Sequence, residues 1–167
     1  MNRTVTFFGA LCVTGGLFLT VALDAGQQAR GGVPAPRAVQ TMTPAPAGPL
    51  PPMPLNGPLA RSRDIVAAVY EFAARHPEVL QYVPCYCGCE RVGHTANHSC
   101  FVKSRAADGR VTEWDSHGLG CAVCLDVARD AMNLFNAGGK PAAIRDAIDK
   151  KYGPHFPSAT PTPRPAR

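Results

Sequence analysis

Residues 121–137, CAVCLDVARDAMNLFNA, carry the strongest helical pattern in the chain. Apolar side chains recur there every three or four positions and form one face of the predicted helix: Cys124, Val127, Ala128, Ala131, Leu134 and Phe135. Gly138 and Gly139 follow at once and predict the end of the helix. This stretch therefore predicts a helix that buries one face in a core and begins at a C-x2-C pair. We interpret Met132, two turns beyond Cys124, as a core residue.

Proline and glycine predict the limits of three more helices. One helix begins after Ser62 and ends before Pro77, which opens a short second helix that ends at Pro84. Pro141 opens a last helix, which Gly153 closes.

The sequence between these helices has no helical period. Residues 85–93, CYCGCERVG, predict a Cys-rich loop, and the β-prone runs 101–103 and 111–114 with a glycine turn between them predict a small β-hairpin. The fold class expected from the sequence is mainly α, with about four helices, a Cys-rich loop and a small β-hairpin in a single small domain.

The ends of the chain differ in composition from its middle. A basic start and an uncharged apolar run predict a signal peptide or N-terminal membrane anchor over residues 1–25. Nine of the 17 prolines lie in the predicted Pro/Ala/Gly-rich linker, 26–59, and we expect residues 157–167 to be a disordered Pro-rich tail. The Cys/His-rich domain then spans 60–156. This organisation predicts an exported protein of the periplasm or cell envelope, held at the membrane if the first segment is not cleaved.

The net charge of +5 does not indicate a nucleic-acid partner. Residues 60–156 hold 12 Lys and Arg against 11 Asp and Glu, so that most of the positive excess lies in the terminal segments. No basic stripe interleaved with aromatic residues is present, and we therefore expect no nucleic-acid binding.

Six cysteines and three histidines fall within residues 85–124, in three local groups. Their spacings are C-x-C-x-C, H-x3-H-x-C and H-x3-C-x2-C. Alternate residues of an extended chain face the same way, and a C-x2-C pair at a helix start favours thiolate. We predict eight of these side chains as metal ligands: Cys85, Cys87, Cys89, Cys100, Cys121, Cys124, His94 and His117.

Thiolate donors select soft metal ions, of which Cu(I) and zinc are the two that fit here. A tetrahedral zinc site uses four ligands and would leave several of the eight unused, so the sequence favours Cu(I). The predicted function is extracytoplasmic binding of Cu(I), for sequestration or for transfer to an envelope protein partner. We favour a function without enzymatic activity.

Two other functions fit the same residues. Cysteines outside the cytoplasm commonly form disulfides, and three bridges would give a stapled interaction domain without chemistry. Bridges between residues two apart are rare, which would direct these bridges to more distant partners. Alternatively, Cys121 and Cys124 would act as a thiol–disulfide oxidoreductase, with Cys121 attacking and Cys124 resolving, although the chain lacks the usual βαβ setting.

The run Pro84-Cys85-Tyr86-Cys87-Gly88-Cys89 resembles the signature of the PCYCGC-motif family of exported bacterial proteins and lipoproteins. The resemblance begins at about Ile65 and extends through further positions: His94, Cys100-Phe101, Trp114-Asp115, His117-Gly118, Cys121, Cys124-Leu125-Asp126 and 144–153. It implies an envelope location, on a tether or a lipid anchor. The sequence departs from the lipoproteins of this family because it has no lipid-attachment box.

Overall fold

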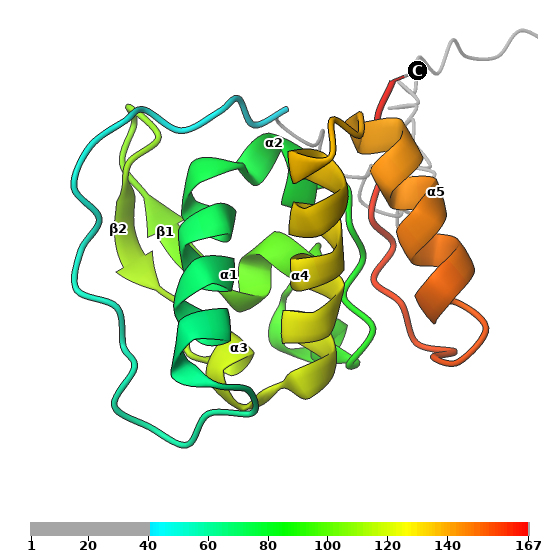
Figure 1. Cartoon of the computed structure of the whole chain (residues 1–167), viewed down its shortest axis with the longest axis horizontal. Coiled ribbons are helices and arrows are strands. Elements are labelled where there is room, and N and C mark those ends of the chain that lie inside the picture. Colours follow the sequence, from blue (N-terminus) through cyan, green and yellow to red (C-terminus); the bar gives the residue numbers. More distant parts are fainter. Residues whose placement is uncertain (1–40, 167) are drawn as a thin grey trace, which may run out of the picture. The chain divides into compact units, whose positions relative to one another are not determined.

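Two helices, α1 (Arg63–Arg75) and α4 (Ala122–Asn136), form the centre of the computed structural model, which describes residues 41–166. They lie side by side in Figure 1 and pack against each other. Each helix places fully buried aliphatic side chains in the core, among them Val66 and Val69 of α1 and Leu125 and Val127 of α4. The predicted core face of α4 is confirmed in its first three turns, whereas Leu134 is exposed.

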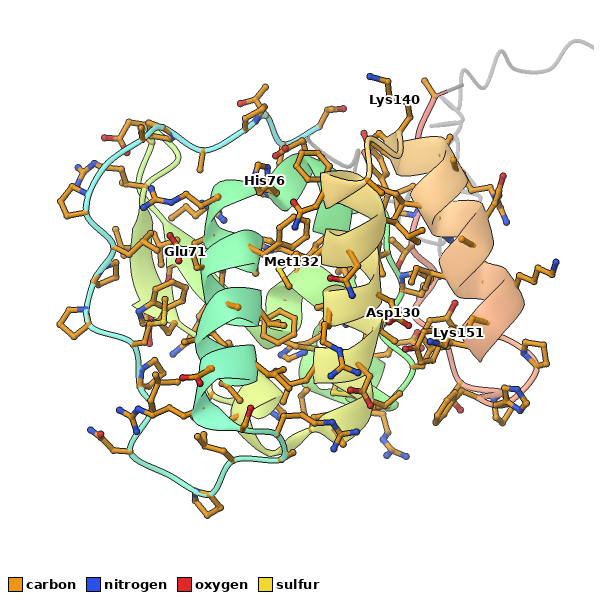
Figure 2. The ribbon with its side chains drawn as sticks, viewed as in Figure 1. Glu71, His76, Asp130, Met132, Lys140 and Lys151 are labelled. Atoms are coloured by element: carbon orange, nitrogen blue, oxygen red, sulfur yellow. A yellow bond between two sulfur atoms is a disulfide. The ribbon has the colours of Figure 1, made fainter. Side chains whose placement is uncertain are left out.

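Two shorter helices begin at prolines, as the sequence predicts. Pro77 opens α2 (Pro77–Leu80), and Pro141 opens α5 (Pro141–Tyr152). Helix α5 packs against α4, and Asp130 of α4 accepts hydrogen bonds from Lys151 Nζ at 2.6 Å and from Tyr152 Oη at 2.7 Å. Figure 2 shows Asp130 facing Lys151 across this contact.

The predicted hairpin is present. Strand β1 (Val102–Arg105) pairs antiparallel with β2 (Val111–Trp114), and Gly109 in the turn has a left-handed φ of 86°. The hairpin lies on the far side of α1 from α4 in Figure 1. Tyr70 of α1 joins the two layers, because its ring packs edge-on against Phe101 and Trp114.

The Cys-rich loop contains more helix than we expected. Two 3-10 turns, η1 (Cys89–Val92) and η2 (Asn97–Cys100), lie between α2 and the hairpin, and a single turn α3 (His117–Gly120) precedes α4. Residues 41–166 thus hold five α-helices, three of them seven residues or longer, and the mainly α class with one small hairpin is confirmed. Helix α3 passes so close to Phe101 that a Cβ atom at Gly118 would lie 2.5 Å from its ring.

The described part of the predicted linker packs against the domain. Trp114 Nε1 donates to the Pro51 carbonyl at 3.2 Å, Ala45 N donates to Arg75 O at 3.2 Å, and Leu50 and Met53 contact the core. The prolines of this segment therefore do not prevent its apolar side chains from contacting the core.

The described part of the Pro-rich tail, which the composition predicts to be disordered, contacts the domain in the structure. Thr160 and Thr162 are buried, and Arg145 Nη1 of α5 donates to the carbonyls of Tyr82, Thr162 and Pro163. This one guanidinium therefore joins the tail to the segment that leads into the Cys-rich loop.

The predicted signal peptide or membrane anchor, 1–25, lies outside the described residues. Among residues 41–166, no helix has the length and apolar character needed to cross a membrane.

Candidate metal centre

The loop that carries Cys85, Cys87 and Cys89 is held at its first residue by the C-terminal tail. Cys85 is buried, its backbone N–H donates to Thr160 Oγ1 at 2.9 Å, and its carbonyl accepts from Thr160 N at 3.0 Å. Gly88 adopts a left-handed φ of 77°, a conformation that side chains disfavour, and lets the loop double back before η1. The three sulfurs consequently face the same interior point.

Two later cysteines reach this point from separate elements. Cys100 ends η2 and Cys124 lies in the first turn of α4, and both are buried. Asn97, also fully buried, joins η2 to α4, because its Nδ2 donates to Cys124 O at 3.3 Å. Its backbone N donates to Val83 O at 2.8 Å and so joins η2 to the segment before the Cys-rich loop.

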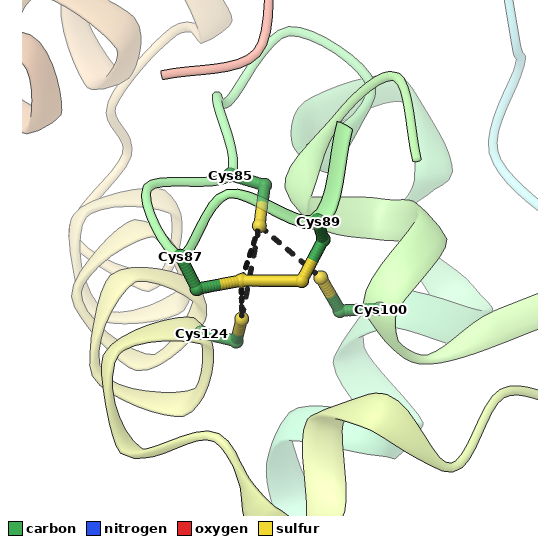
Figure 3. A group of neighbouring side chains, drawn as sticks. All are labelled: Cys85, Cys87, Cys89, Cys100 and Cys124. Carbon is green, nitrogen blue, oxygen red and sulfur yellow. Dashed lines mark hydrogen bonds between the residues drawn. A yellow bond between two sulfur atoms is a disulfide. The ribbon is translucent and has the colours of Figure 1, made fainter. Parts of the chain in front are cut away.

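Five sulfurs meet where these segments converge, as Figure 3 shows. The sulfur cluster consists of Cys85, Cys87, Cys89, Cys100 and Cys124, and all its Sγ atoms lie within 4.8 Å of one another. Cys85 Sγ is 3.5 Å from Cys100 Sγ and 3.8 Å from Cys124 Sγ. Tetrahedral coordination with metal–sulfur bonds of about 2.3 Å separates its sulfurs by about 3.8 Å, so the spacings among these three free thiols are close to the edges of a metal site. Cys87 Sγ lies nearer, at 3.1 Å from Cys85 Sγ and 3.3 Å from Cys124 Sγ.

Cys87 and Cys89 are joined by a disulfide. We expected such a bridge to be rare between residues two apart; the turn at Gly88 brings the two Cα atoms to 5.6 Å, within the usual range for disulfides. Cys85, Cys100, Cys121 and Cys124 are free thiols, so the three-bridge arrangement is not present within residues 41–166. In this oxidised form three sulfurs of the cluster remain as donors.

The free thiols of the cluster share protons unequally. Hydrogen bonds from Cys100 and Cys124, together with backbone N–H groups of the loop, lower the pKa of the Cys85 thiol well below its ordinary value despite burial. Hydrogen bonding to Cys100, then to Cys121 and Cys85, raises the pKa of Cys124. Cys85 is therefore the thiol of the metal-free cluster that loses its proton most readily. Binding of a cation would release protons from its partners.

Cys121, a predicted ligand, lies outside the sulfur cluster. It is the N-cap of α4, half-buried, and its Sγ accepts a hydrogen bond from Cys124 N at 3.4 Å. Hydrogen bonding from Cys124 lowers the pKa of the Cys121 thiol, as expected for a sulfur at a helix N-terminus. The two cysteines of the C-x2-C pair thus have different positions: Cys121 caps α4, and Cys124 faces the sulfur cluster.

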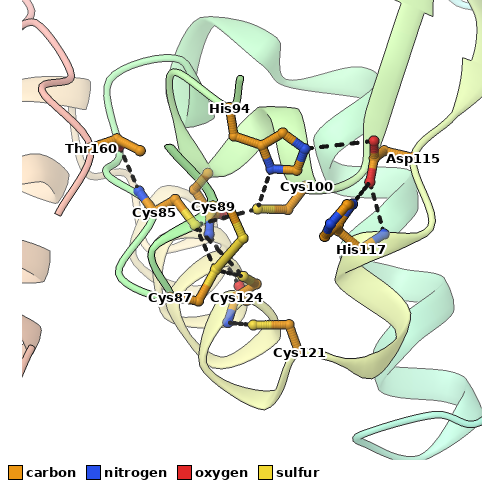
Figure 4. The surroundings of a disulfide bond; sticks show 11 residues. Cys85, Cys87, Cys89, His94, Cys100, Asp115, His117, Cys121, Cys124 and Thr160 are labelled. Carbon is orange, nitrogen blue, oxygen red and sulfur yellow. Dashed lines mark hydrogen bonds and ion pairs between the residues drawn. A yellow bond between two sulfur atoms is a disulfide. The ribbon is translucent and has the colours of Figure 1, made fainter. Parts of the chain in front are cut away.

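The two predicted histidine ligands lie at the edge of the cluster, around one carboxylate (Figure 4). His94 Nδ1 is 3.4 Å from Cys100 Sγ, and its Nε2 is 3.6 Å from Asp115 Oδ2. His117 does not contact the sulfurs, and its Nδ1 lies 3.1 Å from Asp115 Oδ1. In the sequence, Asp115 lies two residues before His117, which suggests a contact between these two side chains. The contact of Asp115 with His94 has no signal in the sequence.

Other side chains considered with the site have structural roles. His98 is buried and its Nε2 accepts a hydrogen bond from Arg105 Nη2 at 3.1 Å; burial, and secondarily Arg105, lowers the pKa of His98 to about 3, so it stays neutral. Met132 lies on the face of α4 that packs against α1 in Figure 2, as predicted for a core residue. Thr160, which holds Cys85, carried no signal in the sequence.

These observations define a small, mainly helical domain with a buried group of thiols that can hold a metal ion. A family model described as "Protein of unknown function with PCYCGC motif" matches residues 53–165, well over half of the chain, and the protein belongs to this family. The match begins within the packed part of the predicted linker and extends through the packed tail. The comparisons find no match among curated proteins and none among solved structures.

Proposed function

We propose that this protein binds a soft metal ion, Cu(I), through its sulfur cluster and acts outside the cytoplasm to sequester copper or to pass it to an envelope protein. The observation that carries the proposal is the convergence of sulfurs from three separate segments, Cys85–Cys89, η2 and α4, within 4.8 Å. Burial of a thiolate, the form of cysteine that binds metal, costs solvation unless a cation or hydrogen bonds compensate its charge. A soft cation is the partner that thiolate donors select.

The number and position of the donors favour copper over zinc. Reduction of the Cys87–Cys89 disulfide would supply five sulfurs, one more than a tetrahedral zinc site uses. In the oxidised form, Cys85, Cys100 and Cys124 remain as three donors. Cu(I) accepts two or three thiolates because it is soft and carries a single positive charge, which so few anionic ligands already neutralise. Zinc would need a fourth ligand there.

The exported location is part of the proposal and rests on the apolar segment predicted at residues 1–25 and on the Pro-rich sequence that follows. Transfer to a partner is compatible with the partial exposure of Cys87 and Cys89, the two cluster residues that are not buried. Thiolates of an incoming protein would reach the metal from this side.

The oxidoreductase alternative is supported by one feature, the lowered pKa of Cys121 at the start of α4. Cys121 and Cys124 are not bridged, and the sheet of residues 41–166 is a two-stranded hairpin without a βαβ unit. The arrangement thus gives less support to turnover than to binding. Absence of insulin reduction by the purified chain would remove this alternative.

The C-x2-C pair provides a matched test of the copper proposal. Reduced full-length chain competes for Cu(I) with the colorimetric chelator bicinchoninate, under anaerobic conditions, as wild type, Cys124→Ser and Cys121→Ser. Loss of Cys124 should weaken Cu(I) binding by at least about 100-fold, more than is typical for a residue beside a ligand. Cys121→Ser keeps a side chain that can cap α4 and accept from Cys124 N, so it should change the affinity by less than about tenfold. Equal affinities for all three chains would contradict the proposal, and zinc binding without Cu(I) binding would replace copper by zinc.

A further inference from the structure

A second group of metal-ligand side chains lies beside the sulfur cluster and has different chemistry. His94, Asp115 and His117 each present one ligand atom, and these three atoms lie within 4.8 Å of one another. We infer that this triad, the His–Asp–His site, binds a divalent transition-metal ion such as Zn²⁺ independently of the sulfur cluster. Two imidazoles and a carboxylate are borderline-to-hard donors, which favour divalent ions over Cu(I).

The distances fit a metal site. Asp115 Oδ1 is 3.1 Å from His117 Nδ1, and Oδ2 of the same carboxylate is 3.6 Å from His94 Nε2. Ligands at about 2.0–2.1 Å from a tetrahedral ion are separated by about 3.3–3.4 Å, between these two values. The two imidazole rings cross edge to face with centroids 4.9 Å apart, so that both converge on the carboxylate instead of stacking.

The backbone holds the central carboxylate in place. Asp115 N donates to Phe101 O at 2.9 Å, and Asp115 O accepts from the buried Tyr70 hydroxyl at 2.7 Å. The Asp115 side chain also accepts from His117 N at 2.8 Å. A site fixed in this way loses little conformational entropy on binding an ion.

The contact between the two sites sets the tautomer of His94. Its Nδ1 lies 3.4 Å from Cys100 Sγ, and a proton on Nδ1 donated to this sulfur leaves the lone pair on Nε2, which faces Asp115. A histidine ligand commonly donates its other ring N–H to an acceptor, which orients the ring and raises its basicity. Cys100 would act as that acceptor, so His94 would serve the divalent site without occupying a position at the sulfur cluster.

The site is open on one side. His94 is 8% exposed and the Asp115 side chain 14%, whereas the His117 side chain is 49% exposed. Three protein ligands with an open fourth position are the arrangement in which zinc keeps a water molecule or an exchangeable ligand. The ion would therefore be exchangeable from solvent, in contrast to one held in the buried sulfur cluster.

The simplest competing interpretation is an ion-pair network in which Asp115 accepts hydrogen bonds from both histidines and binds no metal. The imidazole nitrogens report the difference directly. Uniformly ¹⁵N-labelled, reduced full-length chain is titrated with Zn²⁺, and long-range ¹H–¹⁵N spectra follow the rings of all five histidines. Zn²⁺ bound by the thiols would affect His94 first at Nδ1, beside Cys100, whereas Zn²⁺ at the His–Asp–His site would bind Nε2, so the two nitrogens distinguish the sites.

Zn²⁺ should shift His94 Nε2 and one ring nitrogen of His117 together, at the same metal concentration, and leave the exposed His155 unchanged. The variant His117→Gln, altered at an exposed position, should weaken the response of His94 by at least about tenfold, and His155→Ala should not change it. Asp115→Asn, which keeps an oxygen acceptor for His117 N, should weaken binding to a similar extent and serves if His117→Gln fails to fold. Absence of shifts at both rings, a shift of His94 Nδ1 instead of Nε2, or an unchanged response in both variants would overturn the inference.

Discussion

The contact between the C-terminal tail and the Cys-rich loop predicts a measurable loss of stability in Thr160→Val. Thr162 Oγ1 donates to Thr95 O at 2.9 Å and lies 2.7 Å from Thr160 Oγ1, so the Thr160 hydroxyl donates to Thr162 while it accepts from Cys85 N. Valine has nearly the same shape but neither donor nor acceptor. The substitution therefore leaves the buried Cys85 N–H without a partner and removes one donor from Thr162.

An unsatisfied buried donor costs about 1–3 kcal/mol of unfolding free energy. A loss of about 2 kcal/mol lowers the urea midpoint by about 1 M when the slope is about 2 kcal/mol/M. Urea unfolding of the full chain can be followed by the fluorescence of Trp114, the one tryptophan of the sequence. Its indole packs against Tyr70 and donates to the Pro51 carbonyl, so its emission reports the folded core.

Ser158→Ala is the matched control, because Ser158 is an exposed hydroxyl residue of the same tail. It should change the unfolding free energy by less than about 0.5 kcal/mol. If Thr160→Val unfolded at the midpoint of the wild type and of Ser158→Ala, the tail would not be seated on the loop, and the account of how Cys85 is held would be refuted.

Three further predictions concern packing, redox state and pH. Gly118→Ala places a Cβ atom 2.5 Å from the Phe101 ring. The substitution should lower the unfolding free energy by about 1–3 kcal/mol in urea titrations. A wild-type midpoint would show that α3 moves aside at no cost. Reduction of the Cys87–Cys89 disulfide should raise the Cu(I) affinity measured by competition with bicinchoninate, because two more thiolates become available, and equal affinity of the oxidised and reduced chains would show that neither sulfur contributes to binding. The hydrogen bond with Arg61 lowers the pKa of Asp126 in the folded chain below its ordinary value of 3.8. The ionised carboxylate therefore stabilises the fold above pH 3.8, and this stabilisation is lost as the pH falls through the pKa of the folded chain. Asp126→Asn should accordingly be less stable than wild type by about 0.5–1 kcal/mol at pH 7 and equal to it in strong acid, and a difference that persists in acid would contradict the ionic origin.

The sequence was most informative where proline and glycine act locally. Pro77 and Pro141 open helices at the predicted positions because their fixed φ and missing N–H suit a first turn. Helix α3 was not predicted, because four residues are too few for a hydrophobic period. It forms where the chain must reverse between β2 and α4, a requirement of the tertiary structure.

The composition of the Pro-rich segments on either side of the domain did not predict that they pack against it. Proline predicts that a segment contributes few backbone donors, and it does not exclude packing of the side chains between the prolines. Thr160 and Thr162 alternate with prolines, and they form hydrogen bonds with the loop residues Cys85 and Thr95 through their hydroxyls and the Thr160 backbone N–H. Only the spatial position of the tail beside Cys85 shows this.

The division of the candidate ligands between two sites also lies beyond sequence reasoning. Spacing indicated that the sulfurs of the C-x-C-x-C run could converge, but the inclusion of Cys124 and the exclusion of Cys121 depend on which of them caps α4. Similarly, Asp115 lies near His117 in sequence, whereas its contact with His94 requires the loop to fold back over the end of β2.

X-ray absorption at the copper edge tests the central claim most directly, because it reports which atoms surround the ion. Full-length chain loaded with one equivalent of Cu(I) should show a first shell of sulfur alone. These sulfurs belong to Cys85, Cys100 and Cys124, with or without Cys87 and Cys89. A first shell dominated by nitrogen or oxygen, or failure of the reduced chain to retain the ion at all, would contradict the claim that these buried thiols form a soft-metal site.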